Sequence, residues 1–327
     1  MKKRLFSITL IFILIISAFA GCKKKQVGTS EDNAFVEEQE VQKSFHFGFS
    51  SMDMDNPFYI TLEQSVRETV EANGHTMTSA NPHMDTDLQI QQIDEMISEG
   101  IDAIFLCPIS WDQITPALDE LREADVKIIN IDSEVKDFDK VDAFVGSDNK
   151  EAGKLCGKDL IESRPDGGKI VILEATVQNS VKERISGFEE ETAGEGFEVI
   201  ARTDCNGETS AAYDAVSALL AEHSNITAIM CGNDPMALGA ISAIREAGRN
   251  EILVYGVDGS PELKKELLKE NTPLKATCGQ SPINIGKKAA QIGQMILNNE
   301  KFDKKTYEDV FLINSENIDM YGADGWQ

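Results

Sequence analysis

The amino-acid sequence predicts an α/β protein in which parallel β-sheets carry helices on both faces. One reason is that short apolar runs alternate with amphipathic segments of period 3.6 from Ser44 onward. The other is length, because 327 residues exceed one compact domain and the two halves repeat the same alternation. We therefore expect two doubly wound lobes, with ligand-binding loops at the carboxyl ends of the strands.

The N-terminus has the pattern of a secretory signal peptide over residues 1–22. A basic start, Met1 to Arg4, precedes an apolar run, Leu5 to Ala20, that is shorter than the ~20 residues of a membrane-spanning helix. An uncleaved membrane anchor is the alternative. The segment ends in Phe19-Ala20-Gly21-Cys22, which resembles the bacterial lipoprotein cleavage box, with Phe19 in place of the usual Leu. The resemblance implies lipidation of Cys22 and an extracytoplasmic protein anchored to the bacterial cell membrane.

Residues 23–43 are rich in Lys, Glu and Gln and have few apolar residues. They predict a flexible tether, because they have too little apolar surface to fold. Beyond the tether, apolar runs predict buried strands at Phe45–Phe49, Ala103–Cys107, Val126–Ile131, Ile170–Leu173, Ala228–Cys231 and Ile252–Val257.

Helices are predicted where apolar side chains recur with the helical period and a glycine follows. The clearest is Pro57–Asn73, which begins with a proline and is followed by Gly74. The same pattern predicts helices over Asp87–Glu99 and Ala237–Ala247. Since each helix follows a strand, the strands of each lobe should run parallel.

The charge balance excludes nucleic acid as a partner. The chain has 31 Lys and Arg against 56 Asp and Glu, a net charge of −25. Removal of the signal peptide, with Lys2, Lys3 and Arg4, would make the exported protein more acidic still. Such a surface repels phosphate backbones and anionic lipid headgroups.

Five cysteines remain after Cys22, and none has the Cys-x-x-Cys spacing of zinc or redox sites. They are Cys107, Cys156, Cys205, Cys231 and Cys278. An odd number leaves at least one thiol free. We favour buried, reduced thiols over disulfides, because several lie in or beside apolar runs.

Motifs for catalysis or cofactor binding are missing. There is no glycine-rich phosphate loop, no Gly-x-Ser-x-Gly elbow, and no His pair at metal-binding spacing. Asp53-x-Asp55-Asn56 lacks the glycine and terminal glutamate of a calcium loop, so a polar loop is the better interpretation. We therefore expect no enzyme activity, no cofactor and no metal.

Polar and aromatic residues instead follow five of the strands. They form the groups Asp55-Asn56-Pro57-Phe58-Tyr59, Asp132-Ser133-Glu134, Gly232–Gly239, Asp258-Gly259-Ser260-Pro261 and Gly279-Gln280-Ser281-Pro282. Each group alone is explained by helix capping. Together they predict a ligand site, because the carboxyl ends of parallel strands meet at one edge of a sheet.

Four of these motifs, Asn56–Tyr59, Asn233–Ala240, Val257–Pro261 and Gly279–Pro282, resemble the ribose-type periplasmic sugar-binding proteins. The likeness runs from about Phe45 to Asn317 in the family's order. This family comprises solute receptors of ABC importers with the type I periplasmic binding protein fold. The resemblance implies two lobes joined by three crossovers near residues 146–148, 280–282 and 310–313. The N-terminal lobe would be 44–146 plus 283–309, and the C-terminal lobe 147–279 plus 314–327.

The resemblance also assigns ligand-binding roles, which suit a polyhydroxylated neutral ligand. Hydrogen bonds would come from Asn56, Asp132, Arg184, Asn233, Asp258 and Gln280, and a stacking wall from Phe58 and Tyr59. Further candidates are Asp55, Ser133, Glu134, Trp111 and Asn206. Trp111 packing on its own helix is an equal alternative.

Departures from the family leave the ligand open. Ser133 and Glu134 follow Asp132 where ribose binders have an Arg, and an aromatic residue expected near Asn206 is missing. A pentose, a hexose, a sugar alcohol or an amino sugar would each fit. The expected protein is a monomeric receptor that delivers this solute to ABC permease subunits. A receptor that presents the sugar to a sensor kinase or chemoreceptor is the alternative, and a transcription regulator is excluded by the export signal.

Overall fold

The structure, a computed structural model, describes residues 43–327. These residues belong to one compact unit. The predicted signal peptide, Cys22 and almost all of the predicted tether lie outside the described residues.

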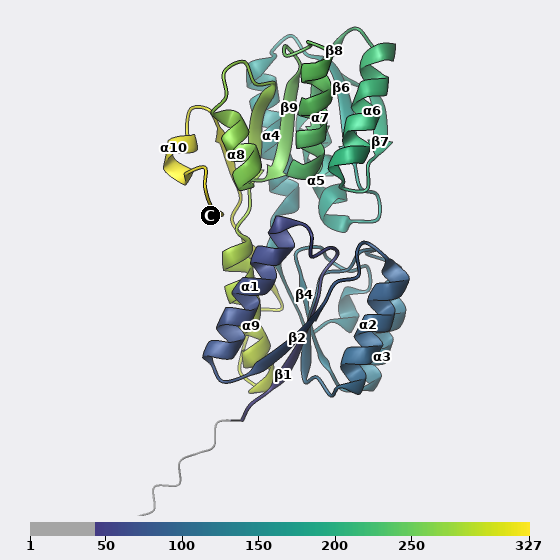
Figure 1. Cartoon of the computed structure of the whole chain (residues 1–327), viewed down its shortest axis with the longest axis vertical. Helices are drawn as coiled ribbons and strands as arrows, with labels where there is room; N and C mark the ends of the chain where they lie inside the picture. Colours follow the sequence, from purple (N-terminus) through teal and green to yellow (C-terminus); the bar gives the residue numbers. More distant parts are fainter. Residues whose placement is uncertain (1–42) are drawn as a thin grey trace, which may run out of the picture. The chain divides into compact units, whose positions relative to one another are not determined.

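The first sheet has six strands in the order β11-β5-β4-β3-β1-β2, all of them parallel (Figure 1). Its strands are β1 (His46–Ser50), β2 (Thr76–Ala80), β3 (Ala103–Leu106), β4 (Lys127–Ile131), β5 (Ala143–Ser147) and β11 (Lys305–Glu308). Helices cover both faces: α1 (Pro57–Ala72) and α9 (Pro282–Leu297) on one, α2 (Thr86–Ser98) and α3 (Thr115–Glu123) on the other. A short 3-10 turn, Phe138–Lys140, precedes β5.

The second sheet repeats this plan in the order β12-β10-β9-β8-β6-β7. Its strands are β6 (Gly168–Glu174), β7 (Phe197–Asp204), β8 (Ile226–Cys231), β9 (Leu253–Asp258), β10 (Leu274–Gly279) and β12 (Phe311–Asn314), the last being antiparallel to β10. Its helices are α4 (Asn149–Ser163), α5 (Asn179–Thr192), α6 (Thr209–Glu222), α7 (Asp234–Glu246), α8 (Pro261–Leu267) and the short α10 (Ile318–Tyr321).

The predicted fold class is confirmed. Each sheet has an apolar core on either face, as expected for parallel strands buried by helices on both sides. The chain passes between the sheets three times, from β5 to β6, from β10 to β11 and from β11 to β12.

Two of the strands that the sequence did not predict, β2 and β11, have few apolar residues and lie at the edges of their sheet. β2 reads Thr-Met-Thr-Ser-Ala and β11 reads Lys-Thr-Tyr-Glu, and both lie at the edges of the first sheet. Edge strands are only half covered, so their sequences carry little of the apolar signal that marks buried strands. The predicted helices agree with α1, α2 and α7 to within a few residues.

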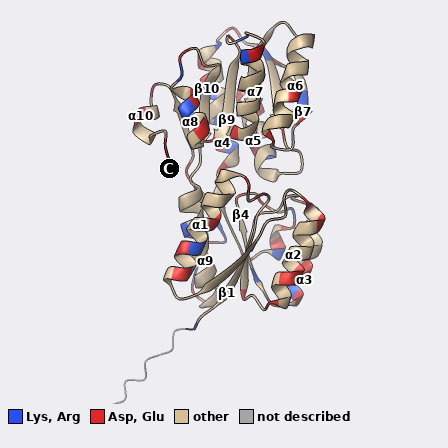
Figure 2. Cartoon of the chain, in the orientation of Figure 1, with Lys and Arg blue, Asp and Glu red and all other residues tan. Residues whose placement is uncertain are grey.

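Charges lie on the helices and loops rather than in the sheet cores. Figure 2 shows β1 without charged residues, whereas the outer helices α2 and α3 carry many. The five cysteines of residues 43–327 are all free and buried, as we expected. Over the same residues, none of the helices is both long and apolar enough to cross a bilayer.

Candidate ligand-binding site

A small cavity between the two sheets brings together side chains from both lobes. It is lined by Asn56, Phe58, Tyr59, Asp132, Gln178, Ser180, Arg184, Asn233, Asp258 and Gln280. All eight residues to which the sequence assigned a ligand-binding role therefore surround one space. The cavity volume is about 20 Å³, which suits a water molecule rather than a sugar ring. A sugar can enter only if the lobes or the walls move.

Helix starts position several of these side chains. Asn56 caps α1, and its Oδ1 accepts a hydrogen bond from the Phe58 N–H at 2.9 Å. Asn233 caps α7 in the same way through the Met236 N–H at 3.0 Å. Asn56 and Asn233 therefore have both roles: each side-chain amide caps a helix through its oxygen and also lines the cavity.

Asp132 presents a carboxylate oxygen that needs a donor. It follows β4 with a φ of 60°, a left-handed conformation that is uncommon for a residue other than glycine. The Tyr59 hydroxyl donates to its Oδ2 at 3.2 Å, whereas its buried Oδ1 has no hydrogen-bond partner among residues 43–327. Burial raises the pKa of Asp132, and the nearby Arg184 opposes that shift.

Gln280 provides a second unsatisfied acceptor among the residues that line the cavity. Gln280 donates through Nε2 to Asp258 Oδ1 at 2.8 Å, and its buried Oε1 has no partner within the described chain. Unpaired buried acceptors cost free energy, so a ligand that brings hydroxyl donors to Asp132 and Gln280 would be favoured.

Arg184 is held rigidly at 3% exposure. Its Nε donates to Asn149 Oδ1 at 2.7 Å and its Nη1 to the Gly232 carbonyl at 2.9 Å. The same Nη1 lies 3.6 Å from Asp258 Oδ1. These contacts fix the guanidinium before any ligand arrives, which reduces the entropy lost on binding.

Asp258 is the most perturbed acid of the site. Burial and the nearby Asp234 carboxylate raise its pKa to about 8, and Arg184 opposes this shift. Asp234, itself fully buried, accepts hydrogen bonds from Thr277 Oγ1 and the Ser260 N–H, both at 2.7 Å. Asp258 therefore binds its proton far more strongly than an exposed carboxyl group.

Sequence reasoning missed Gln178 and Ser180, which also line the cavity. They lie between β6 and the first turn of α5, at the carboxyl end of a strand that the sequence did predict. The signal that could have found them is the rule already applied to the other strands. It was weak here because the connecting loop carries no Asp, Gly or Pro motif.

The five further candidates lie outside this cavity. Ser133 is buried beside it, and its Oγ accepts from the Ser180 N–H at 3.2 Å. The backbone N–H of Trp111 donates to the Val177 carbonyl at 3.0 Å, and Lys182 Nζ lies 3.9 Å from the centre of the Trp111 ring. Trp111 therefore contacts the second lobe.

The other three candidates are engaged in local contacts of their own. Glu134 pairs with Lys305 Nζ at 2.7 Å. Asn206 is exposed in the loop after β7, where its N–H donates to Asp204 Oδ1 at 2.9 Å. Asp55 is exposed near the start of α1.

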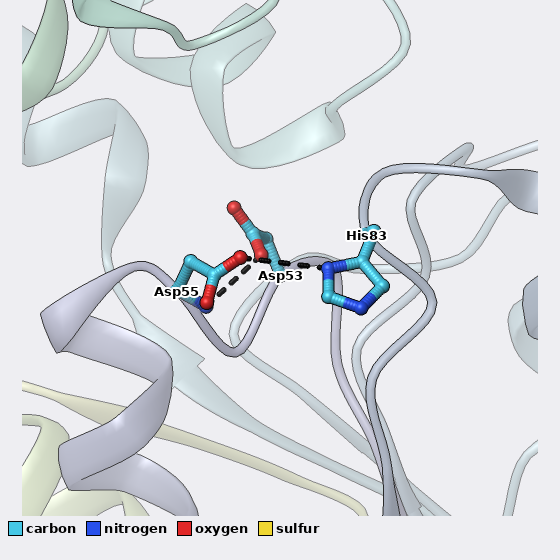
Figure 3. Close-up of side chains that lie close together, drawn as sticks. All are labelled: Asp53, Asp55 and His83. Atoms are coloured by element: carbon cyan, nitrogen blue, oxygen red, sulfur yellow. Dashed lines mark hydrogen bonds and ion pairs between the residues drawn. The ribbon is translucent and has the colours of Figure 1, made fainter.

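Asp55 belongs to a cluster of possible metal-binding side chains. Asp53 and Asp55 come from the loop after β1 and His83 from the loop after β2 (Figure 3). His83 Nδ1 lies 3.5 Å from Asp55 Oδ2, and both side chains are well exposed. We assign no metal to this cluster, because water competes freely for such exposed groups.

Comparison with known proteins agrees with the fold and identifies the family. Residues 47–301 match the family described as periplasmic binding protein domain. The ribose import binding protein RbsB of Bacillus subtilis is 28% identical over 264 residues, which cover 80% of this chain and 85% of that protein. The D-ribose/D-allose-binding protein of Pseudomonas aeruginosa is 30% identical, with 65% and 70% covered.

Solved structures show the same fold. An ABC transporter solute-binding protein from Mycobacterium smegmatis, with bound glycerol, superposes with a TM-score of 0.81 at 26% identity, covering 85% of this chain and 97% of that one. One from Bacillus halodurans, with bound myo-inositol, has a TM-score of 0.80 at 21% identity, covering 86% and 98%. The chain thus belongs to the periplasmic binding protein domain family, a family of extracytoplasmic binding proteins rather than of enzymes.

Proposed function

We propose that the protein is a receptor that binds a monosaccharide or polyol between its lobes and delivers it to an ABC importer. Two of the similar proteins are named for ribose and allose, and two solved structures have glycerol or myo-inositol bound, all of which are neutral polyhydroxy compounds. No nucleophile or metal takes part in this function, since binding and release are its only chemical steps.

The observation that carries the proposal is the chemistry of the cavity wall. Asp132 Oδ1, in the proposed first lobe, and Gln280 Oε1, at a proposed hinge crossing, are buried acceptors without partners among the described residues. A polyol supplies hydroxyl donors to both, and its hydroxyl oxygens accept from Arg184. Charged hydrogen-bonding groups bind hydroxyls strongly and directionally, and the Phe58 ring covers a C–H face.

Lobe movement gives the receptor its response to the ligand. We propose the lobes as 44–146 plus 283–309 and 147–279 plus 314–327, hinged near 146–148, 280–282 and 310–313. Since the cavity residues come from both lobes, a bound sugar favours the arrangement in which they are close. The importer can then distinguish the loaded receptor from the empty one.

We further propose that the mature protein is a monomer anchored through lipid on Cys22. Support comes from the cleavage-box pattern and from the polar segment 23–43, rich in Lys and Glu, which has the composition of a tether. Metabolic labelling with palmitate in a bacterial host tests this. The wild type should be labelled and membrane-bound, whereas Cys22→Ser should be unlabelled. Equal labelling of both would contradict the anchor.

Titration calorimetry tests the binding function. Residues 42–327 should be titrated with pentoses, hexoses, sugar alcohols, cyclitols and amino sugars. We expect one-to-one binding of at least one neutral member of the panel. Heat from none of them would overturn the proposed function, and preference for an amino sugar would correct the neutral ligand class.

A further inference from the structure

The segment 322–327 reaches from one lobe to the other. It follows α10, whose last residue Tyr321 stacks on Phe311 of β12 with ring centroids 4.6 Å apart. From this anchor in the second lobe, the segment runs to Trp326, which packs against the apolar core of the first sheet. The predicted lobe boundaries place all of 314–327 in the second lobe, so the Trp326 contact was not expected.

Three polar contacts hold the segment in place. The fully buried Lys264 of α8 donates from Nζ to the Gly325 carbonyl. Lys265 pairs with Asp324 at 3.4 Å. Ser281, at the passage from β10 to α9, donates its hydroxyl proton to the Gln327 carbonyl oxygen.

Trp326 contacts Phe58, one of the residues that line the ligand site. Its ring meets Phe58 edge-on, with centroids 5.7 Å apart and an interplanar angle of 78°. Tyr59 makes a second edge contact to Phe58, at 5.3 Å and 90°. Phe58 lies in the first turn of α1, and these two contacts together set the plane of its ring.

Trp326 also lines a second cavity of about 200 Å³ beside the ligand site. Asn56 and Asp258 belong to both cavities, and Pro57 and Pro235 add apolar wall to the second. Trp326 therefore lines a cavity together with candidate-site residues of both lobes. When the lobes separate, either the Trp326–Phe58 contact or the Lys264 anchor must give way, because Phe58 and Lys264 are on different lobes.

We infer that residues 322–327 form a strap across the two lobes, and that Trp326 is a positioning residue that orients Phe58 for ligand binding. The inference rests on the proposed function for its ligand-binding part. Its structural part, the restraint on the start of α1, holds whatever the ligand is. No contact between Trp326 and the ligand is needed.

The ligand-independent test is hydrogen–deuterium exchange of residues 42–327. Trp326→Ala should speed exchange of the amides of Phe58, Tyr59 and Ile60, which bond to Asn56 at the start of α1. Trp326→Phe should restore the wild-type rates. The control is Met320→Ala, because Met320 is 81% exposed in α10, which directly precedes the segment. Wild-type exchange in Trp326→Ala would overturn the strap, even if no sugar binds.

The ligand-dependent test uses the sugar found by calorimetry. Trp326→Ala loses one aromatic edge contact, so its affinity for the sugar should fall about 2- to 10-fold through faster dissociation. Trp326→Phe and Met320→Ala should bind as wild type.

A fluorescence experiment gives a second readout. The chain has two tryptophans, so a Trp111→Phe variant keeps only Trp326. Bound sugar should then reduce the quenching of Trp326 fluorescence by acrylamide. Wild-type affinity in Trp326→Ala, or quenching unchanged by sugar, would overturn its positioning role, whereas a wild type that binds no sugar would overturn only the proposed function.

Discussion

At the scale of single residues, Asp258 couples the site to pH. Its pKa is raised to about 8 by burial and by Asp234, from an ordinary value of 3.8. The folded protein therefore keeps a proton there that the unfolded chain has released. This stabilisation is complete below pH 3.8 and is lost as the pH rises through about 8.

Asp258→Asn tests this linkage without any ligand. Between about pH 6 and pH 9, the free energy of unfolding should fall more steeply in the wild type than in Asp258→Asn, because Asn has no proton to lose. Denaturant unfolding at several pH values measures both slopes. Equal slopes would show that Asp258 is already ionised at pH 6.

The residue scale is also where the sequence was most informative. Asn56, Asp132, Asn233, Asp258 and Gln280 follow strands and have ligand-binding roles implied by the family resemblance, and the structure places all five around one cavity. What the sequence could not show is the environment of each group. Whether Glu134 faces a ligand or Lys305 depends on β11, which joins the sheet from far along the chain.

At the scale of elements, α5 determines the second-lobe side of the site. It carries Ser180 and Arg184, and it packs closely on α4 through two glycines. A Cβ on Gly153 would lie 1.8 Å from the Arg184 carbonyl oxygen, and one on Gly187 would lie 2.0 Å from the Lys150 carbonyl oxygen. This separation of the two helices leaves no room for a side chain at either position.

Gly153→Ala should therefore displace α5 and Arg184 with it. We expect a loss of about 1–3 kcal/mol in the free energy of unfolding, as for overpacked cores, together with weaker sugar binding. Chemical denaturation and calorimetry measure the two effects. Lys158→Ala, on the exposed side of α4, is the control. A Gly153→Ala protein as stable as this control would contradict the close packing.

The α5 element also carries a contact between the lobes that avoids the cavity. Lys182 Nζ lies over the Trp111 ring, and the backbone N–H of Trp111 donates to the Val177 carbonyl. An exposed cation–π contact is worth about 0.5–1 kcal/mol, so Lys182→Ala should weaken sugar binding about 2- to 5-fold. Lys182→Arg should keep wild-type affinity in the same titration. Unchanged affinity in Lys182→Ala would show that this contact does not contribute to the free energy of sugar binding.

At the scale of the whole molecule, the alternation of strands and helices was enough to predict two parallel sheets. The edge strands β2 and β11 were not predictable, because half-exposed strands lack a continuous apolar run. Nor was the strap, since contacts between Trp326 and Phe58 join residues that are remote in sequence and have no pattern in common. The sequence thus predicts elements and their order better than contacts between distant segments.

The central claim is that a sugar binds between the lobes at the cavity around Arg184 and Asp258. Calorimetric titration of the wild type, Arg184→Ala and Asp258→Ala with one sugar tests it most directly, with exposed Asp94→Ala as the control. The account predicts one-to-one binding by the wild type and the control, and loss of binding by the other two variants with their circular dichroism unchanged. Binding of wild-type strength in both Arg184→Ala and Asp258→Ala would contradict it.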